Sequence, residues 1–368
     1  MLYEQLDTPC LLINLDIVEK NLRRVADFAL EQGVALRPHA KTHKIPALAR
    51  MQIESGAVGI CSAKLSEAEV MLNGGIKDIF IANQIIGSKK LSKLIELSRR
   101  PVRLSSAVDS LAGAAALNHA MQQAELWHDV LIEIDTGLNR CGLADETDRR
   151  CDEILKLAAF IISSNGLRLK GIYTHEGHIN SMIDRNRAEE NALRVGQKMV
   201  QIAESIRAAG FDCPTVSVGA TSVYRVTPTV PGVTEMRPGT YIFNDAGMVA
   251  VGAADWNDCA VSILCSVISR PAANRAVIDA GSKTFSSDKY PFQTSFGAFK
   301  YRPELSVTWL NEEHGVIIGD VSCLKIGDKV EILPNHVCSA VNMHDQAVAV
   351  RKGHIEAVWE IEARGKLT

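Results

Sequence analysis

From residue 10 to about residue 220, short apolar runs alternate with longer amphipathic stretches. The stretches repeat their apolar residues with the 3.6-residue period of a helix, as residues 16–33 do. Near-continuous apolar strands separated by helices are typical of a parallel sheet covered by helices, and eight such units favour a (β/α)₈ barrel. The predicted strands are residues 10–15, 35–41, 57–63, 78–83, 102–109, 128–137, 167–177 and 214–220.

The pattern changes after about residue 250. Strand-like runs follow one another without helices between them, and Gly-Asp or Lys-Gly turns separate several of them, which indicates an all-β domain. We therefore predict an α/β barrel domain over residues 10–250 and a β domain over residues 251–368, which also takes residues 1–9. The predicted strands of the second domain are residues 259–268, 275–280, 304–311, 314–319, 328–334, 346–352 and 354–363.

Composition and charge exclude several classes of protein. The 368 residues are 46% hydrophobic and 23% charged with a net charge of −3, so the basic surface that nucleic acid requires is not expected. No apolar run approaches the roughly 18 residues of a membrane span, and the first ten residues lack the apolar core of a signal peptide. Nine cysteines without a framework spacing indicate a reducing compartment. We predict a cytoplasmic protein that binds neither nucleic acid nor membrane.

In a barrel of this kind the active site lies at the carboxyl ends of the strands, so polar residues at those ends are the candidates. Lys41 ends the strand at 35–41. Partial desolvation there favours the neutral amine, which is the form that attacks a carbonyl carbon to make a Schiff base. A surface lysine in a strand–helix loop is the alternative on position alone.

Two further strand ends carry groups suited to a phosphorylated heterocycle. The sequence SVGATSVY at 217–224 has small residues and hydroxyls, which suit backbone binding of a phosphate, although an ordinary glycine turn has the same pattern. Arg140, in EIDTGLNRCG, offers a guanidinium to a ring nitrogen or a carboxylate. A structural ion pair, for example with Asp135, explains that arginine equally well.

His336 and Cys338 follow an expected strand in PNHVCSAVNMHD. If the backbone stays extended, residues two apart face the same side, so an imidazole and a thiolate would meet. These ligands favour Zn²⁺, and two protein ligands leave coordination positions open for water or substrate. A buried histidine beside a buried cysteine is the alternative.

Several motifs in matching order resemble one known family. They are residues 8–22 (TPCLLINLDIVEKNL), 37–44 (RPHAKTHK), 237–245 (RPGTYIFND), 279–288 (DAGSKTFSSD), 312–315 (EEHG) and 334–338 (PNHVC). Together they resemble the fold-type III enzymes of the D-threonine aldolase and eukaryotic-type D-serine dehydratase group, which use pyridoxal 5′-phosphate (PLP). The resemblance implies an alanine-racemase-like barrel, a C-terminal β domain, a homodimer, and PLP held on Lys41.

The resemblance also implies roles for other residues. The phosphate of PLP would lie at Gly219, Ala220 and Thr221, with Tyr241 as a further contact, and Arg140 would meet the pyridine nitrogen. The segment GIYTHEGH departs from the aldolase-like YHG pattern, and His175 stands where that pattern has its tyrosine, which makes it a candidate catalytic residue.

The metal motif separates two branches of the family. Aldolases of the family show His-x-Asp, whereas dehydratases show His-x-Cys, as in His336-Val337-Cys338. We therefore expect a Zn²⁺-dependent dehydratase (Mn²⁺ or Mg²⁺ being the alternative metals) that converts D-serine or D-threo-3-hydroxyaspartate to a keto acid and ammonia. Arg225 and Arg237 would suit a second substrate carboxylate or a structural role.

Three other activities compete with the dehydratase. An aldolase would release glycine and an aldehyde from a D-3-hydroxy amino acid. A racemase needs a second acid/base group and no metal, and a non-catalytic PLP carrier needs neither a metal motif nor the β domain, so both fit the motifs less well.

Overall fold

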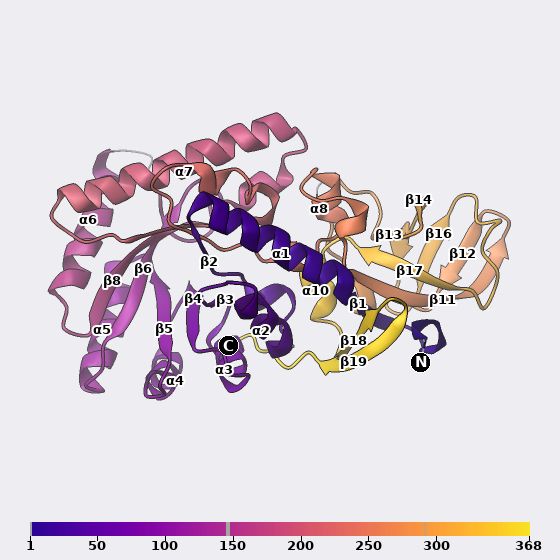
Figure 1. Cartoon of the computed structure of the whole chain (residues 1–368), viewed down its shortest axis with the longest axis horizontal. Coiled ribbons are helices and arrows are strands. Elements are labelled where there is room, and N and C mark those ends of the chain that lie inside the picture. Colours follow the sequence, from indigo (N-terminus) through magenta and orange to yellow (C-terminus); the bar gives the residue numbers. More distant parts are fainter. Residues whose placement is uncertain (1, 145–147, 291) are drawn as a thin grey trace. The chain divides into compact units, whose positions relative to one another are not determined.

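The computed structural model describes residues 2–144, 148–290 and 292–368, and Figure 1 labels its elements. The chain divides into two compact units. The sheet unit comprises Met1–Val25, Thr42–Ile45 and Thr240–Gly365, and the barrel unit comprises Ala26–Lys41, Pro46–Gly239 and Lys366–Thr368. No helix in the described part of the chain combines the length and apolar character needed to cross a membrane.

The barrel unit contains the predicted parallel sheet, with helices between successive strands (Figure 1). Its strands follow the order β2-β10-β9-β8-β6-β5-β4-β3. The two ends of this order meet, because the amide of Val58 donates to Leu36 O at 2.9 Å and that of Cys61 to Pro38 O at 2.7 Å. The α/β barrel prediction is therefore confirmed.

The strands are β2 (Ala35–Leu36), β3 (Ile60–Ser62), β4 (Asp78–Gln84), β5 (Arg103–Val108), β6 (His128–Asp135), β8 (Leu167–Tyr173), β9 (Thr215–Val218) and β10 (Glu235–Met236), with β7 (Leu143–Ala144) beside β6. The helices are α2 (Pro46–Glu54), α3 (Leu65–Asn73), α4 (Ser88–Ser98), α5 (Leu111–Gln123), α6 (Asp148–Ser163) and α7 (Arg185–Ala208).

One strand prediction was wrong. The apolar run at 10–15 forms β1 (Cys10–Asn14), which pairs antiparallel with β11 and parallel with β18 in the sheet unit. The eighth barrel strand is instead β10, which pairs with β2 and β9. A buried strand such as β1 has the same apolar character in either sheet, so the pattern could not show which sheet it joins. β10 has only two residues, which is too short to show a strand period.

The sheet unit is built mostly from antiparallel strands, as predicted for the C-terminal region. The main path of its sheet is β14-β13-β17-β11-β1-β18-β19, and β12, β15 and β16 extend it from β11. The strands are β11 (Val261–Ala272), β12 (Arg275–Ile278), β13 (Gly297–Phe299), β14 (Arg302–Ser306), β15 (Trp309–Leu310), β16 (Gly315–Ile318), β17 (Lys329–Pro334), β18 (Gln346–Arg351) and β19 (His354–Glu360). The remaining helices are α1 (Leu15–Gln32), which begins in this unit, α8 (Ala246–Ala250), α9 (Ser282–Phe285) and α10 (Val337–Val341).

Apolar side chains from five barrel strands form a cluster, which contains Cys61, Phe80, Ala107, Leu131 and Tyr173. The rings of Phe80 and Tyr173 meet edge to face with their centroids 4.9 Å apart. These residues alternate with outward-facing ones along their strands, as barrel geometry requires. The cluster supports the strand ends on which the polar candidates lie.

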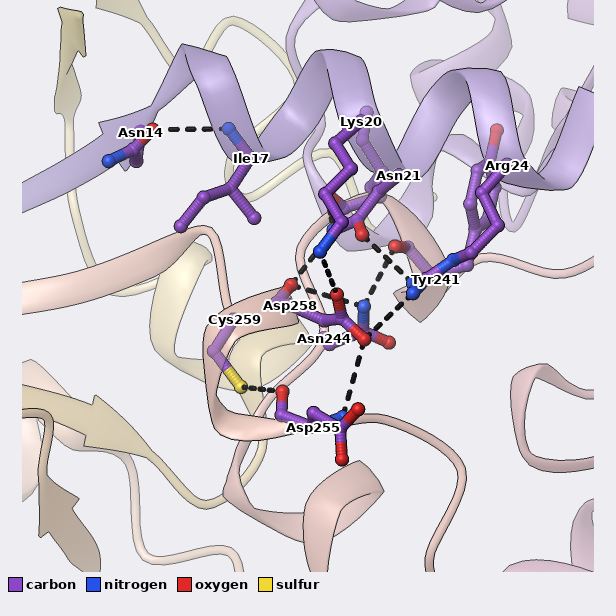
Figure 2. Close-up of polar contacts among 11 residues, drawn as sticks. Asn14, Ile17, Lys20, Asn21, Arg24, Tyr241, Asn244, Asp255, Asp258 and Cys259 are labelled. Carbon is purple, nitrogen blue, oxygen red and sulfur yellow. Dashed lines mark hydrogen bonds and ion pairs between the residues drawn. The ribbon is translucent and has the colours of Figure 1, made fainter. Parts of the chain in front are cut away.

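The first turns of α1 are held by Asp258, whose side chain is only 5% exposed (Figure 2). Its carboxylate accepts hydrogen bonds from Lys20 Nζ at 3.1 Å and Arg24 Nη1 at 2.7 Å, and its carbonyl accepts one from Asn21 Nδ2 at 2.8 Å. Burial works against the charge of Asp258, but the hydrogen bonds from Arg24 and Lys20 outweigh it and lower its pKa. This contact ties α1 to the segment that leads into β11.

Replacing Asp258 with asparagine is expected to lower the free energy of unfolding by about 2 kcal/mol at pH 7, because two cations lose a charged acceptor. The folded-state pKa lies below the ordinary aspartate value of about 3.9, so this stabilisation is present above that pH and is lost as the pH falls through the folded-state pKa. Urea unfolding of both proteins between pH 3 and pH 7 measures the difference. Glu190→Gln, which removes an exposed pair with Arg194, is the control and should change nothing measurable.

Candidate active site

Lys41 lies in the short 3₁₀ turn Ala40–Thr42, which three residues separate from the end of β2 at Leu36, so the strand is shorter than the predicted 35–41 and Lys41 lies in the loop that follows it. Its side chain is partly buried, and its backbone amide donates to Nδ1 of His39 at 3.3 Å. The charge of Lys41 acts on two neighbours. Burial raises the pKa of Cys61 to about 11, although the positive charges of Arg237 and Lys41 act to lower it. The pKa of His175 is lowered first by burial and then by the charge of Lys41. The charge of Lys41 is therefore felt at both residues, which lie on or just after barrel strands β3 and β8.

His175 follows β8 and is held in one tautomer. Its Nδ1 lies 2.6 Å from the carbonyl oxygen of Gly219, and because a carbonyl only accepts, Nδ1 carries the proton. Burial, followed by the charge of Lys41, lowers the pKa of His175 to about 3, so the ring is neutral at physiological pH. Nε2 therefore carries a lone pair that can accept a hydrogen bond.

The predicted phosphate loop lies beside His175. The Gly219 amide donates to Oε2 of Glu176 at 2.9 Å, so it is already engaged. The amides of Ala220 and Thr221, in contrast, donate to no group within the described part of the chain. The hydroxyl oxygen of Thr221 accepts from the amide of Gly239 at 3.2 Å, which leaves its own proton free. Two unengaged amides and a hydroxyl fit a phosphate group.

Gly219 has a packing reason to lack a side chain. A Cβ there would lie 3.0 Å from Cβ of Arg237 and 3.2 Å from the Arg237 carbonyl oxygen. The loop therefore lies directly against the residue that follows β10. A lysine amine and an anion cradle on the same rim are what PLP needs, and in this respect the residues present fit the cofactor.

Arg140 also reaches this region, since its charge contributes to the lowered pKa of His175 after burial and Lys41. The arginine side chain is 53% exposed, and its Nη2 lies 3.9 Å from Oε1 of Glu133. Glu133 in turn accepts from Nε2 of Gln84 at 2.5 Å. The contact with Glu133 is long, so it leaves the guanidinium donors available. Its contact with the pyridine nitrogen stays a prediction.

The predicted metal ligands are brought together in the sheet unit, although not by an extended chain. His336 is the N-cap of α10, so Cys338 lies in the first turn of a helix. Oδ2 of Asp245 accepts from the amide of Val337 at 3.0 Å and fixes this turn. Sγ of Cys338 lies 3.3 Å from the hydroxyl of Thr42, the residue after Lys41 in the chain.

The surroundings of His336 suit a metal ligand. Burial disfavours the charged ring, but Cys338, Asp245 and Asp288 outweigh burial and raise its pKa to about 10. Nδ1 lies 2.9 Å from Oδ2 of Asp288, which leaves Nε2 for a metal. Metal-bound histidines commonly donate their other nitrogen to a carboxylate in this way. An imidazole, a thiolate and an orienting carboxylate therefore fit Zn²⁺ with open coordination positions.

A second group of metal-type side chains lies in the barrel unit and was not predicted. Ligand atoms of Asp109, Glu133 and Cys141 lie within 4.8 Å of one another. Nε2 of Gln84 donates to both carboxylates, and the amide of Gly142 donates to Asp109 at 3.2 Å. These hydrogen bonds satisfy the carboxylates without an ion.

Some site residues were missed by the sequence reasoning. Asp245 and Asp288 are the last residues of the motifs at 237–245 and 279–288, so the motif ends themselves were the available signal. Glu176, inside GIYTHEGH, offered no signal beyond being acidic. Tyr241 is buried in the turn Thr240–Ile242 of the sheet unit, and its phosphate contact stays a prediction.

Comparisons with known proteins agree with this arrangement. One family model, described as alanine racemase, N-terminal domain, matches residues 13–246, and another, described as putative serine dehydratase domain, matches residues 260–350. The chain is 34% identical to a D-threonine aldolase of Arthrobacter sp., over 98% of this chain and 93% of that protein. It is also 34% identical to a D-threo-3-hydroxyaspartate dehydratase of Delftia sp., over 91% of each chain.

Solved structures show the same likeness in three dimensions. The crystal structure of D-threonine aldolase from Filomicrobium marinum superposes with a TM-score of 0.91 at 33% identity, over 100% of this chain and 98% of that chain. The match extends over both units, and the identity is well above the level at which only a fold is shared. The chain therefore belongs to the fold-type III PLP-dependent lyases, in the family that joins an alanine-racemase-type N-terminal domain to a serine dehydratase domain.

Proposed function

We propose that this lyase acts on D-β-hydroxy amino acids with PLP and a divalent metal, and that it is a dehydratase releasing a keto acid and ammonia. The observation that carries the proposal is the His336–Cys338 pair, with Asp288 hydrogen-bonded to the histidine at 2.9 Å. A thiolate ligand favours Zn²⁺ over harder metals. D-serine and D-threo-3-hydroxyaspartate are the proposed substrates, because both carry a β-hydroxyl that such a metal would polarise.

When bound, PLP supplies an electron sink for the carbanion at Cα, and the metal supplies a Lewis acid. The chain's own residues supply placement and proton transfer. Nζ of Lys41 would hold the cofactor, and as a free amine it would take the α-proton of the substrate. Nε2 of His175 carries a lone pair in a neutral ring, which suits it to accept a hydrogen bond from a bound substrate. The amides of Ala220 and Thr221 and the guanidinium of Arg140 orient the cofactor.

The aldolase reaction is the second candidate, and the 34% identity to the Arthrobacter D-threonine aldolase favours it. There the β-hydroxyl loses its proton to a base, and the Cα–Cβ bond breaks to give glycine and an aldehyde. The same residues serve both reactions, so the bond that breaks distinguishes them. The dehydratase is favoured because Cys338 supplies a thiolate where the aldolases of the family have an aspartate.

Product analysis tests the choice directly. The purified, Zn²⁺-loaded protein is given D-serine, D-threonine and D-threo-3-hydroxyaspartate in separate reactions, and the products are identified by mass spectrometry. We expect keto acid and ammonia, with no glycine. Glycine and an aldehyde would overturn the dehydratase in favour of the aldolase. Interconversion of D- and L-alanine by chelator-treated protein would overturn both and indicate a racemase.

We also propose that the protein is cytoplasmic, as its cysteine usage predicts, and that it works as a homodimer, as the resemblance to the family implies. Size-exclusion chromatography with light scattering measures the mass in solution. A mass of twice the 40.0 kDa chain is expected, and a monomeric active enzyme would contradict it.

A further inference from the structure

Two consecutive residues after β8 hold both sides of one peptide in the loop after β9. Nδ1 of His175 donates to Gly219 O at 2.6 Å, and Oε2 of Glu176 accepts from Gly219 N at 2.9 Å. Gly219 is therefore engaged at its donor and at its acceptor. The next two amides, those of Ala220 and Thr221, have no partner in the described part of the chain.

We propose that Glu176 is a positioning residue for the phosphate of the cofactor. By holding the amide of Gly219, it fixes the loop so that Ala220 and Thr221 supply the phosphate donors and Gly219 does not. The inference rests on the proposed PLP-dependent function and deepens it, because it assigns phosphate recognition to a residue that touches neither the substrate nor the reacting atoms.

The burial of Glu176 shows that its hydrogen bond with Gly219 matters. The side chain is 1% exposed, and no cation forms an ion pair with it among the described residues. Arg237, whose charge acts on Glu176, donates through Nε to Ser217 and through Nη2 to the carbonyl of Thr174. Burial raises the pKa of Glu176, and the amide of Gly219 opposes that rise. The backbone amide of the loop is therefore its main partner, and hydrogen bonds to carboxylates are roughly twice as strong as neutral ones.

Packing fixes the loop from a second direction. A Cβ at Gly219 would meet Cβ of Arg237 at 3.0 Å, so the loop lies closely against the residue that follows β10. Glu176 and His175 restrain the peptide along the hydrogen-bonding direction, and Arg237 restrains it from the side. This arrangement differs from a general tie between β8 and β9, because all three contacts fall on the residue next to the unengaged amides.

The test compares PLP with pyridoxal, which lacks the phosphate. Glu176→Met fills the space without an acceptor, and Glu176→Gln keeps an amide oxygen that accepts from Gly219. Cofactor-free protein is titrated with each aldehyde and binding is followed by absorbance. We expect Glu176→Met to weaken the affinity for PLP by about tenfold or more, which is the size expected for losing one buried acceptor. The affinity for pyridoxal should change by less than about twofold. Glu176→Gln should keep PLP affinity within about threefold.

Gly219→Ala gives a second, independent variant that keeps Glu176. Its Cβ must push the loop away from Arg237, so the same selective loss of PLP over pyridoxal is expected. Hydrogen exchange of a peptide covering residues 217–223 in the cofactor-free proteins should be faster in Glu176→Met and unchanged in Glu176→Gln. This readout does not depend on activity.

The inference is overturned if Glu176→Met and Gly219→Ala weaken PLP and pyridoxal equally, which would show a general structural role, or if neither aldehyde is affected. If the unaltered protein binds no PLP at all, the proposed function itself fails. That outcome is separate, because it concerns the parent protein rather than the variants.

Discussion

Replacing Lys41 with alanine is expected to lower kcat/KM by at least about 10⁴-fold on any D-β-hydroxy amino acid that the enzyme accepts. The substitution removes both the amine that holds the cofactor and the base that takes the α-proton, and proton transfer alone contributes roughly 10²- to 10⁴-fold. Initial rates with saturating PLP measure the effect. Borohydride reduction followed by peptide mass spectrometry should find a covalent PLP adduct on Lys41 in the parent protein and none in the variant.

Lys77→Ala is the matched control. Lys77 is an exposed lysine just before β4, so it lies at the amino ends of the strands, opposite to the carboxyl ends where Lys41 stands. Its loss should leave both the adduct and the rate unchanged. An adduct on a lysine other than Lys41, or full activity in Lys41→Ala, would remove the basis of the proposed function.

Replacing His336 or Cys338 with alanine is expected to lower activity by about 10³-fold and to abolish metal binding. A Lewis acid on a leaving hydroxyl contributes several kcal/mol, and each 1.36 kcal/mol corresponds to a factor of ten in rate. The variants are assayed in Zn²⁺, and their metal content is measured by elemental analysis after dialysis. Chelation of the parent protein should reproduce the loss of activity. Added Zn²⁺ should restore activity in the chelated parent protein but not in the two variants.

His354→Ala, an exposed histidine of β19 in the same unit, is the control and should retain metal and activity. Asp288 accepts a hydrogen bond from Nδ1 of His336, and His336→Ala removes that bond. Asp288 still accepts a hydrogen bond from Ser339 in the variant. If turnover survives in both variants, the metal has no catalytic role and the dehydratase proposal loses the observation on which it rests.

Local patterns were sufficient for much of the fold, and they made several residues candidates for the site. Alternation of apolar runs with amphipathic segments predicted the barrel, because burial of a strand between helices requires apolar residues on both faces. The strand-only texture after residue 250 predicted the sheet unit for a similar reason. Lys41 and the 217–224 loop became candidates because barrel chemistry occurs at the carboxyl ends of strands, and His336 and Cys338 because of their spacing. The family resemblance, rather than these local patterns, favoured them over the structural alternatives, and their roles stay predictions. A helix rather than the expected extended segment carries His336 and Cys338.

Apart from the extended backbone expected at 336–338, which is the start of α10, the errors and omissions concern partners that are distant in the chain. β1 looked like a barrel strand, but it pairs with Leu264 and Val348 in the sheet unit. β10 is too short to show a period and exists because β2 and β9 provide its hydrogen bonds. The hydrogen bond between His336 and Asp288 connects residues that are 48 positions apart in the chain.

The sequence by itself determined which segments are strands or helices, which faces are buried, and which strand ends carry reactive side chains. Only the tertiary structure decided which sheet each strand joins, that Glu176 and His175 hold Gly219, and that Asp288 orients His336. The physical reason is that periodicity records whether a side chain is buried, which depends on its own segment. A hydrogen-bond partner depends on where another segment of the chain arrives, and no local pattern encodes that.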